Sequence, residues 1–290
     1  MYGSVSRLEQ RDGSESPRLR ARPAGPDDPV PVELNTDVPH IARIYDYWLG
    51  GKDNFAADRA VAEQAMAAMP SMTASVKTNR AFLARAVNYL ATEAGIRQFL
   101  DIGTGLPSAN NTHEVAQRAA PSSRIVYVDN DPIVLVHARA LLSSTPEGRT
   151  SYISGDLRDP DAILSRAAEI LDFTQPVALM LVAVMHCVPD EDDPYSVVRR
   201  LAAALAPGSY LVLSHPAADV NPSAGAGNAA ARMNQMMPAK VTMRRRDDVA
   251  RFFDGFELLE PGVVAATQWR TDDSAPTAMW AGVGRRPGDR

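Results

Sequence analysis

The chain has 290 residues, a length that accommodates one large domain or two small ones. A net charge of −5 excludes a general electrostatic attraction to nucleic acid or to an anionic membrane. Cys187 is the only cysteine, which excludes an intrachain disulfide and a thiolate metal cluster. With 45% apolar residues, the composition is that of an ordinary globular protein with a buried core.

The N-terminal residues differ in composition from the rest of the chain. Residues 1–34 are rich in Arg, Pro, Gly, Ser and acidic residues, and we expect a disordered arm there, although a partner-binding tail could have the same composition. The arm lacks the apolar region of a secretory signal, and no apolar run approaches the roughly 20 residues that span a bilayer. We therefore expect a cytoplasmic protein with no membrane partner.

Three helical patterns follow the arm. Apolar residues recur at three- and four-residue spacing, and a glycine or a proline ends each pattern. We expect these helices to form a helical cap over residues 35–95. The predicted helices cover residues 40–49, 56–69 and 71–94.

Strand and helix patterns alternate through residues 96–284, which predicts βαβ units and a doubly wound, mostly parallel α/β sheet. Within this core, the Gly-, Asn- and Met-rich segment 216–243 is expected to fold as a lid or an irregular helix over the sheet edge. Residues 285–290 are a short tail. The predicted strands are 98–102, 125–128, 150–153, 177–184, 210–214, 256–260 and 277–283, and the helices lie near 110–120, 132–143, 160–172, 194–206 and 245–253.

The most informative motif lies where the first predicted strand ends. Gly103 and Gly105 permit a turn with positive φ, and Asp101 comes two residues before it. Glycine pairs also occur in α/β loops that bind nothing, and a dinucleotide fingerprint needs a third glycine where this chain has Ser108. A carboxylate ahead of the first glycine would repel a pyrophosphate. It suits a ligand with a positive group, such as the amine of an amino acid.

Two further acids end the next two predicted strands. Asp129 can accept both hydroxyls of a ribose, and the alternative role of helix N-cap falls to Asp131. Asp156 could accept from an adenine amino group with Leu157 against the ring, or it could be an ordinary turn residue. Carboxylates at three successive strand ends predict a nucleoside ligand.

These motifs carry a resemblance to a known family. The order Asp-x-Gly-x-Gly, a strand-end Asp and Gly-Asp-Leu resembles the class I S-adenosylmethionine (SAM)-dependent methyltransferases. Longer segments are similar to the S-adenosyl methyltransferase family common in actinomycetes, over about residues 36 to 284. These segments are Tyr45-Asp-Tyr-Trp-Leu-Gly-Gly-Lys-Asp-Asn54, Asn79-Arg80-Ala-Phe-Leu, Arg97-Gln-Phe-Leu-Asp-Ile-Gly-Thr-Gly-Leu-Pro107 and Tyr127-Val-Asp-Asn-Asp-Pro132.

The resemblance implies a seven-stranded Rossmann-like sheet with one antiparallel strand, SAM as cofactor and methyl transfer as the activity. It puts the methionine amine of SAM at Asp101, whereas Arg80 either pairs with the methionine carboxylate or is a solvated helix residue. Pro107 replaces a third glycine that many class I enzymes have, so the outer part of the turn must take a different path. The expected cofactor-binding residues are Arg80, Asp101, Gly103, Thr104, Gly105, Asp129, Asn130, Asp156, Leu157 and Ala183.

The end of the fourth predicted strand supplies a candidate for catalysis. His186 is a possible general base because its ordinary pKa lies near neutrality, and its alternative is a buried structural histidine. Cys187, next to it, is expected on the opposite face of the strand. No spacing of His and acidic residues predicts a metal site. The candidate residues of an acceptor pocket are Tyr45, Tyr47, Lys52, His186 and Met233, although Tyr45 also suits the apolar face of its helix.

We therefore expect a SAM-dependent methyltransferase that acts on a small-molecule acceptor. The alternatives are a SAM-binding regulatory protein without turnover and an NAD-dependent oxidoreductase. Nucleic acid is not an expected partner, and the sequence makes no prediction of the acceptor or of the oligomeric state.

Overall fold

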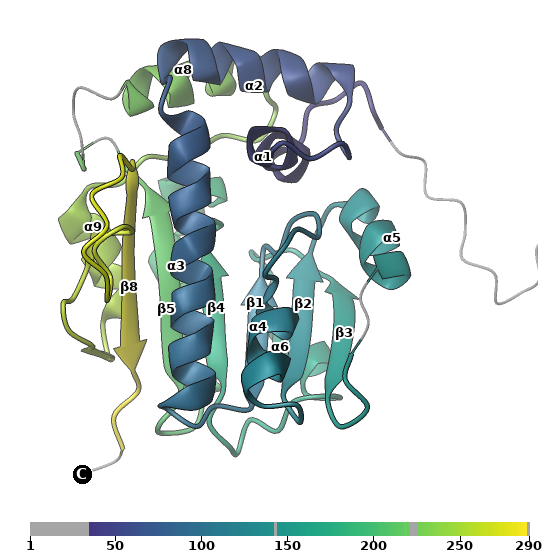
Figure 1. Ribbon diagram of the computed structural model, residues 1–290, viewed down its shortest axis with the longest axis vertical. Coiled ribbons are helices and arrows are strands. Elements are labelled where there is room, and N and C mark those ends of the chain that lie inside the picture. Colours follow the sequence, from purple (N-terminus) through teal and green to yellow (C-terminus); the bar gives the residue numbers. More distant parts are fainter. Residues whose placement is uncertain (1–34, 142–143, 218, 221–224, 289–290) are drawn as a thin grey trace, which may run out of the picture. The chain divides into compact units, whose positions relative to one another are not determined.

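A computed structural model describes residues 35–141, 144–217, 219–220 and 225–288 of the chain (Figure 1). The arm predicted over residues 1–34 lies outside these residues, as do parts of the predicted segment 216–243. The described residues belong to one structural unit that is built around a single mixed sheet.

The sheet has the strand order β3-β2-β1-β4-β5-β8-β6. The first five strands in this order are parallel, and β8 runs antiparallel to β5 and to β6. The expected seven strands with one antiparallel member are present, and a two-residue strand, β7, adds an eighth beside β8. The bounds are β1 Gln98–Ile102, β2 Arg124–Asp129, β3 Arg149–Ser154, β4 Ala178–Val182, β5 Tyr210–Pro216, β6 Glu257–Leu258, β7 Val264–Ala265 and β8 Met279–Arg285.

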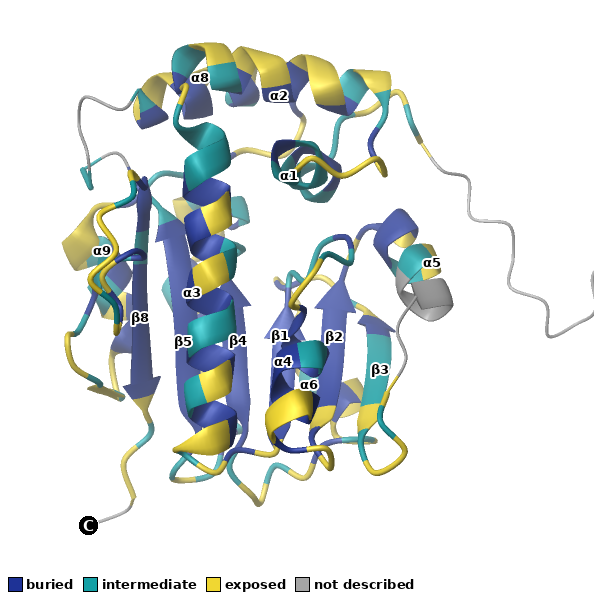
Figure 2. Ribbon diagram, viewed as in Figure 1, coloured by how far each residue is buried: buried dark blue, intermediate teal, exposed yellow. Residues whose placement is uncertain are grey.

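Both faces of the sheet are covered, and alternate residues of the central strands enter different apolar clusters. Phe99 packs with the helices α3 and α4 on one face, whereas Leu100 packs with α6, α7 and α9 on the other. The central strands are therefore buried along their length (Figure 2). Trp269, between β7 and β8, is fully buried and makes an edge contact with the Phe82 ring, with the ring centroids 5.6 Å apart.

The helices follow the predicted order, with ends that differ by a few residues. The long α3 buries the predicted apolar side over its whole length. The bounds are α1 Ile41–Leu49, α2 Ala56–Ala68, α3 Met72–Thr92, α4 Thr112–Ala119, α5 Pro132–Leu141, α6 Pro160–Ala167, α7 Pro194–Ala203, α8 Ala226–Met236 and α9 Arg246–Ala250.

Three of these helices lie beyond the carboxyl ends of the parallel strands. Helices α1, α2 and α8 pack together there around an apolar cluster of their own (Figure 1). Trp48 of α1, Met69 after α2 and Met233 of α8 are among its buried members. The predicted segment 216–243 thus contributes α8 to a helical layer above the sheet edge.

The strand order creates a topological switch point between β1 and β4. The chain proceeds from β1 outward to β2 and β3, and then returns to the other side of β1 as β4. In open α/β sheets, the connections on either side of such a point diverge and leave a crevice at the carboxyl ends of the strands.

Among the described residues, no helix is long and apolar enough to cross a membrane. The cytoplasmic location stays a prediction.

Candidate active site

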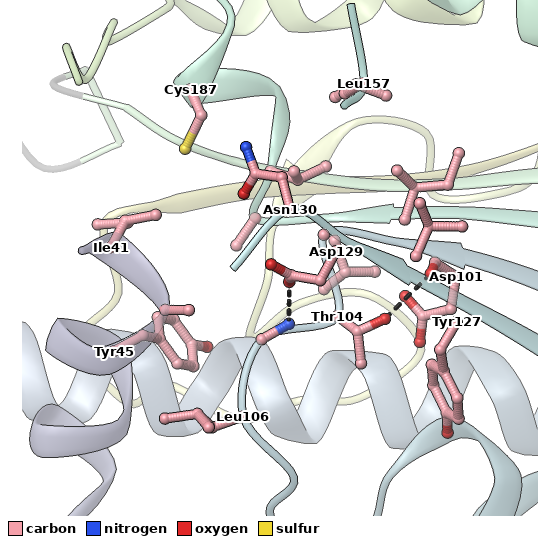
Figure 3. A pocket seen from close by; sticks show the side chains of 18 of the residues that line it. Ile41, Tyr45, Asp101, Thr104, Leu106, Tyr127, Asp129, Asn130, Leu157 and Cys187 are labelled. Carbon is pink, nitrogen blue, oxygen red and sulfur yellow. Dashed lines mark hydrogen bonds between the residues drawn. The ribbon is translucent and has the colours of Figure 1, made fainter. Parts of the chain in front are cut away.

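A cavity of about 180 Å³ lies at the carboxyl ends of β1, β2 and β4, next to α1 (Figure 3). All ten residues that the sequence predicted as cofactor contacts line it. The fold therefore brings together positions that are more than 100 residues apart in the chain, from Arg80 to Ala183.

Hydrogen bonds within the turn and to β2 hold the glycine turn after β1. The Thr104 hydroxyl donates to the Asp101 carbonyl oxygen at 3.0 Å, and the Gly105 amide donates to Oδ2 of Asp129 at 2.8 Å (Figure 3). Gly103 and Gly105 have φ angles of 76° and 67°, in the left-handed region that favours glycine. The turn thus presents its backbone directly to the cavity.

Asp101 is a residue of β1, and it is buried, with 5% of its surface exposed. Burial raises its pKa to about 6, although a hydrogen bond from the Thr112 hydroxyl and the charge of Arg80 act in the opposite direction. That hydrogen bond, 2.6 Å long, goes to Oδ2. The carboxylate therefore carries a negative charge that its protein neighbours compensate only in part, and a cationic ligand group would complete the compensation.

The sequence predicted that Asp131 caps a helix and that Asp129 contacts the ribose. Asp131 Oδ1 accepts from the Ile133 amide at 2.9 Å and so caps α5, which confirms that part of the prediction. Asp129 is 6% exposed and accepts from the amides of Gly105 and Asp131. Burial nevertheless raises the pKa of Asp129, because those two hydrogen bonds offset only part of the desolvation. The ribose role of Asp129 stays a prediction.

Arg80 is not the freely solvated helix residue that the sequence left as an alternative. Its Nη2 donates to the carbonyl oxygens of Ala109 and Asn110, both at 3.1 Å, and to Oδ1 of Asn111 at 3.2 Å. Its Nε is buried and has no hydrogen-bond partner among the described residues. The guanidinium group thus ties α3 to the loop before α4 and keeps one donor available beside the cavity.

The next two predicted contacts come from the loop after β3. Asp156 accepts from the amide and the Nε of Arg158 through Oδ1, which is the turn geometry that the sequence left open as its alternative. Leu157 is 8% exposed and belongs to the core cluster on the α6 face. Asn130, after β2, is exposed at the cavity. A carboxylate, an amide and an apolar side chain therefore line this end of the cavity.

The fourth strand ends two residues earlier than predicted. Ala183 has a φ of 54°, which ends the extended backbone after Val182, and a 3-10 helix follows over Met185–Cys187. The prediction that Cys187 lies on the opposite face of a strand from His186 is wrong, because neither residue is in a strand. Both line the cavity.

His186 is 6% exposed, and its Nδ1 is buried without a partner among the described residues. Burial, assisted by the charge of Arg244, lowers the pKa of His186 to about 4. The imidazole is therefore neutral at physiological pH and keeps a lone pair that can accept a proton.

Arg244 is a residue that sequence reasoning missed. It is 4% exposed and donates to the carbonyl oxygens of Met185 and Val188, and it pairs with Asp190 at 2.6 Å. Its Nη1 also lies 3.0 Å from Nε2 of His215. Since an arginine can only donate, this His215 nitrogen accepts. Arg244 therefore fixes the backbone on both sides of His186.

A chain of buried hydrogen bonds links the cap to the turn after β4. Asn79 donates to the Tyr45 hydroxyl at 2.9 Å and accepts from the Ser214 hydroxyl at 2.6 Å. Ser214 Oγ in turn accepts from the Ala183 amide at 3.0 Å. Asn79 is 2% exposed, so these hydrogen bonds lie inside the protein. Helices α1 and α3 are thereby held in register with the turn that carries His186.

A second, smaller cavity of about 70 Å³ lies between the cap helices and the sheet edge. Tyr45 and His186 line both cavities, and Met233 lines the second one. The structure does not bring Tyr47 or Lys52 to either cavity. The Tyr47 hydroxyl bonds to Glu63, and Lys52 is exposed.

The strand order, the glycine turn and the acids at the strand ends define a Rossmann-like SAM-dependent methyltransferase. The family model described as S-adenosyl methyltransferase matches residues 27–287, and the chain belongs to this family. Its cofactor is SAM, and the assignment favours the methyltransferase over the NAD-dependent oxidoreductase. No curated protein matches the chain.

Solved structures agree with this assignment. A DUF574 family protein from Streptomyces avermitilis MA-4680 is 44% identical, with 87% of this chain and 99% of that one covered and a TM-score of 0.83. A candidate methyltransferase from Thermobifida fusca YX is 41% identical, with 89% and 98% covered and a TM-score of 0.82. The mitomycin 7-O-methyltransferase MmcR, at 16% identity, 84% and 71% coverage and a TM-score of 0.51, shares the fold.

Substitutions in the glycine turn test how closely the ends of β1 and β4 approach each other. A Cβ at Gly103 would lie 2.1 Å from Cγ2 of Val184, whereas a Cβ at Gly105 would meet no atom closer than 4.0 Å. Both positions have positive φ, so either alanine costs about 1 kcal/mol of backbone strain. We expect Gly103→Ala to lose roughly 1–3 kcal/mol more than Gly105→Ala in urea unfolding, because only it overlaps a neighbour. Equal losses would contradict the close approach.

Proposed function

We propose that this enzyme methylates a small molecule that is held between the sheet edge and the cap helices. The observation that carries the proposal is the junction of the two cavities, since Ile41, Tyr45, Ala183 and His186 line both. One cavity offers the groups that suit SAM, and the other lies next to it beneath α8. Residues 35–95 act in this proposal as the cap and residues 216–243 as the lid over a core of residues 96–284.

The residues of the larger cavity fit the parts of SAM. The partly compensated charge of Asp101 suits the methionine amine, and the unpartnered Nε of Arg80 suits the methionine carboxylate. Asp129 suits the ribose hydroxyls, with the Gly103–Gly105 backbone and Asn130 beside it. Asp156 and Leu157 suit the adenine, one as an acceptor and the other as an apolar wall.

The cofactor supplies an electrophilic methyl group on a sulfonium. The protein mainly has to orient the acceptor toward that methyl group, because the reaction is a displacement along one line. His186 is our candidate general base, since burial keeps its imidazole neutral and able to accept a proton from the acceptor. The hydrogen bonds from the Ala183 amide to Ser214 Oγ and from Arg244 to the Met185 carbonyl oxygen hold the segment that carries it.

The raised pKa of Asp101 predicts a pH dependence of cofactor binding. Protonation below about pH 6 removes the negative charge that faces the methionine amine. We expect the affinity for SAM, measured by calorimetry, to be constant above this pH and to fall about tenfold for each pH unit below it. Asp101→Asn should lower the affinity at pH 7.5 by roughly 10–100-fold and remove the dependence.

Thr112→Val is the matched control for this experiment. Its hydroxyl donates to Asp101 and lowers the pKa of that carboxyl, so its loss should move the fall in affinity to higher pH. A wild-type affinity that stays level from pH 7 to pH 5 would contradict the assigned role of Asp101.

The size of the acceptor is testable without knowledge of its identity. We expect SAM labelled in its methyl group, incubated with the enzyme and a cell extract, to transfer label to the fraction of small molecules. Label found in precipitated protein or RNA alone would contradict the proposal, and no transfer to either fraction would favour a SAM-binding regulatory protein. Heat-treated enzyme is the control.

A further inference from the structure

The second cavity has an almost entirely apolar wall. Side chains from α1, α8 and β8, together with the residues around the α2–α3 junction, form it. No Asp, Glu, Lys or Arg is among the described residues that line it, so a charged group would lose its hydration there without compensation. Five of the eleven methionines of the chain contribute to the wall, namely Met69, Met72, Met233, Met243 and Met279.

The polar groups of this wall are already engaged, with one exception. The Tyr45 hydroxyl donates to the Val76 carbonyl oxygen, Trp48 Nε1 donates to that of Ala62, and Ser75 Oγ accepts from the Ala278 amide. Nδ1 of His186 has no partner among the described residues. His186, which also lines the larger cavity, is therefore the one polar side chain of this wall without a hydrogen bond among the described residues.

The surroundings of His186 determine what this site can bind. The charged and titratable groups that face it are the Arg244 guanidinium and the His215 imidazole, whose Nε2 already accepts from Arg244. These neighbours and the burial keep His186 uncharged, so it does not attract a carboxylate or a phosphate. A neutral imidazole can accept a hydrogen bond from a hydroxyl group.

We propose that the second cavity is the acceptor chamber and that it takes an aromatic ring with a hydroxyl group, a phenol, whose O–H donates to His186. This inference rests on the proposed function. Thioether side chains form favourable contacts with aromatic rings, which explains the methionine-rich wall. A phenolic hydroxyl ionises near pH 10, far more readily than an aliphatic alcohol, and therefore needs less assistance from a base.

In the transfer step, the phenol oxygen forms a bond to the methyl carbon while its O–H bond breaks and the proton moves to the imidazole. The carbon–sulfur bond breaks, and its electron pair stays on the sulfur. Because the oxygen becomes strongly acidic as it accepts the methyl group, an imidazole of low basicity suffices. The proton then passes from His186 to solvent.

Methionine methyl groups allow the chamber to be observed by NMR. We would label the methionine methyl carbons with ¹³C, saturate the protein with S-adenosylhomocysteine, and titrate it with phenol, toluene and benzoate. Phenol should shift the signals of the five wall methionines but not those of Met180, in the sheet core, or Met236, on the surface. Phenol should bind about 2–10-fold more tightly than toluene of similar shape, and benzoate should not bind.

Three variants test the two features of the chamber, which are the hydrogen bond to His186 and the apolar cavity beside α8. His186→Phe should bring the ratio of phenol to toluene affinity to about one while both still shift the wall methionines. Ala229→Phe fills the cavity from α8 and should abolish the shifts, whereas Ala231→Phe, on the exposed side of the same helix, should leave them unchanged. Thermal stabilisation by S-adenosylhomocysteine shows that each variant is folded.

Two results would overturn the inference: wall methionines that do not respond to either aromatic probe, or wild-type protein that binds phenol and toluene equally. Both can be obtained with the wild-type chain even if Ala229→Phe does not fold. If S-adenosylhomocysteine itself fails to stabilise the wild-type protein, the proposed function fails instead, so the two failures are distinguishable.

Discussion

The close approach of two strand ends at the switch point is the constraint on which the site depends. The turn after β1 contacts the turn after β4 so tightly that no side chain fits at Gly103, where a Cβ would overlap Val184. This contact places the Asp101 end of β1 next to the segment that carries His186. A nucleoside cofactor on the first turn and an acceptor beside the second can then meet at one point, with no further rearrangement of the sheet.

The charges that the site buries are balanced in different ways. Asp129 receives backbone hydrogen bonds, whereas Asp101 has the Thr112 hydroxyl and the more distant Arg80. Arg244 is buried but engages two carbonyl oxygens, a carboxylate and a histidine. Burial of an incompletely compensated charge costs stability, and such groups are concentrated at functional sites. Asp101, Asp129 and the Nε of Arg80 are incompletely compensated, and these three residues line the same cavity.

Much of this fold follows from patterns within short stretches of sequence. Alternation of strand and helix patterns predicted the order of elements, and the Asp-x-Gly-x-Gly turn with its strand-end acids predicted residues that do line one cavity. The errors concern local backbone angles and contacts between distant segments. The apolar run 177–184 predicted a longer strand because hydrophobicity does not reveal the positive φ of Ala183.

Arg244 and Asn79 illustrate the same limit. Arg244 lies in a run of three arginines that is typical of a solvated surface, and its burial depends on carbonyl groups nearly 60 residues earlier in the chain. Asn79 has a polar side chain, which in a helix is more often exposed, but it bridges Tyr45 and Ser214 inside the protein. Tyr47 and Lys52 share a motif with Tyr45, but Tyr47 is two residues further along α1 and so lies on another side of the helix, and Lys52 lies beyond the turn at Gly50. Only the tertiary structure distinguishes these cases.

We propose that one bound cofactor extends from the acids at the strand ends to the mouth of the second cavity. A crystal structure of the complex with S-adenosylhomocysteine tests it most directly. We expect the amine at Asp101, the ribose hydroxyls at Asp129, and the sulfur directed toward Ala183 and His186. A ligand whose ribose lies away from Asp129, or whose sulfur faces away from His186, would contradict it.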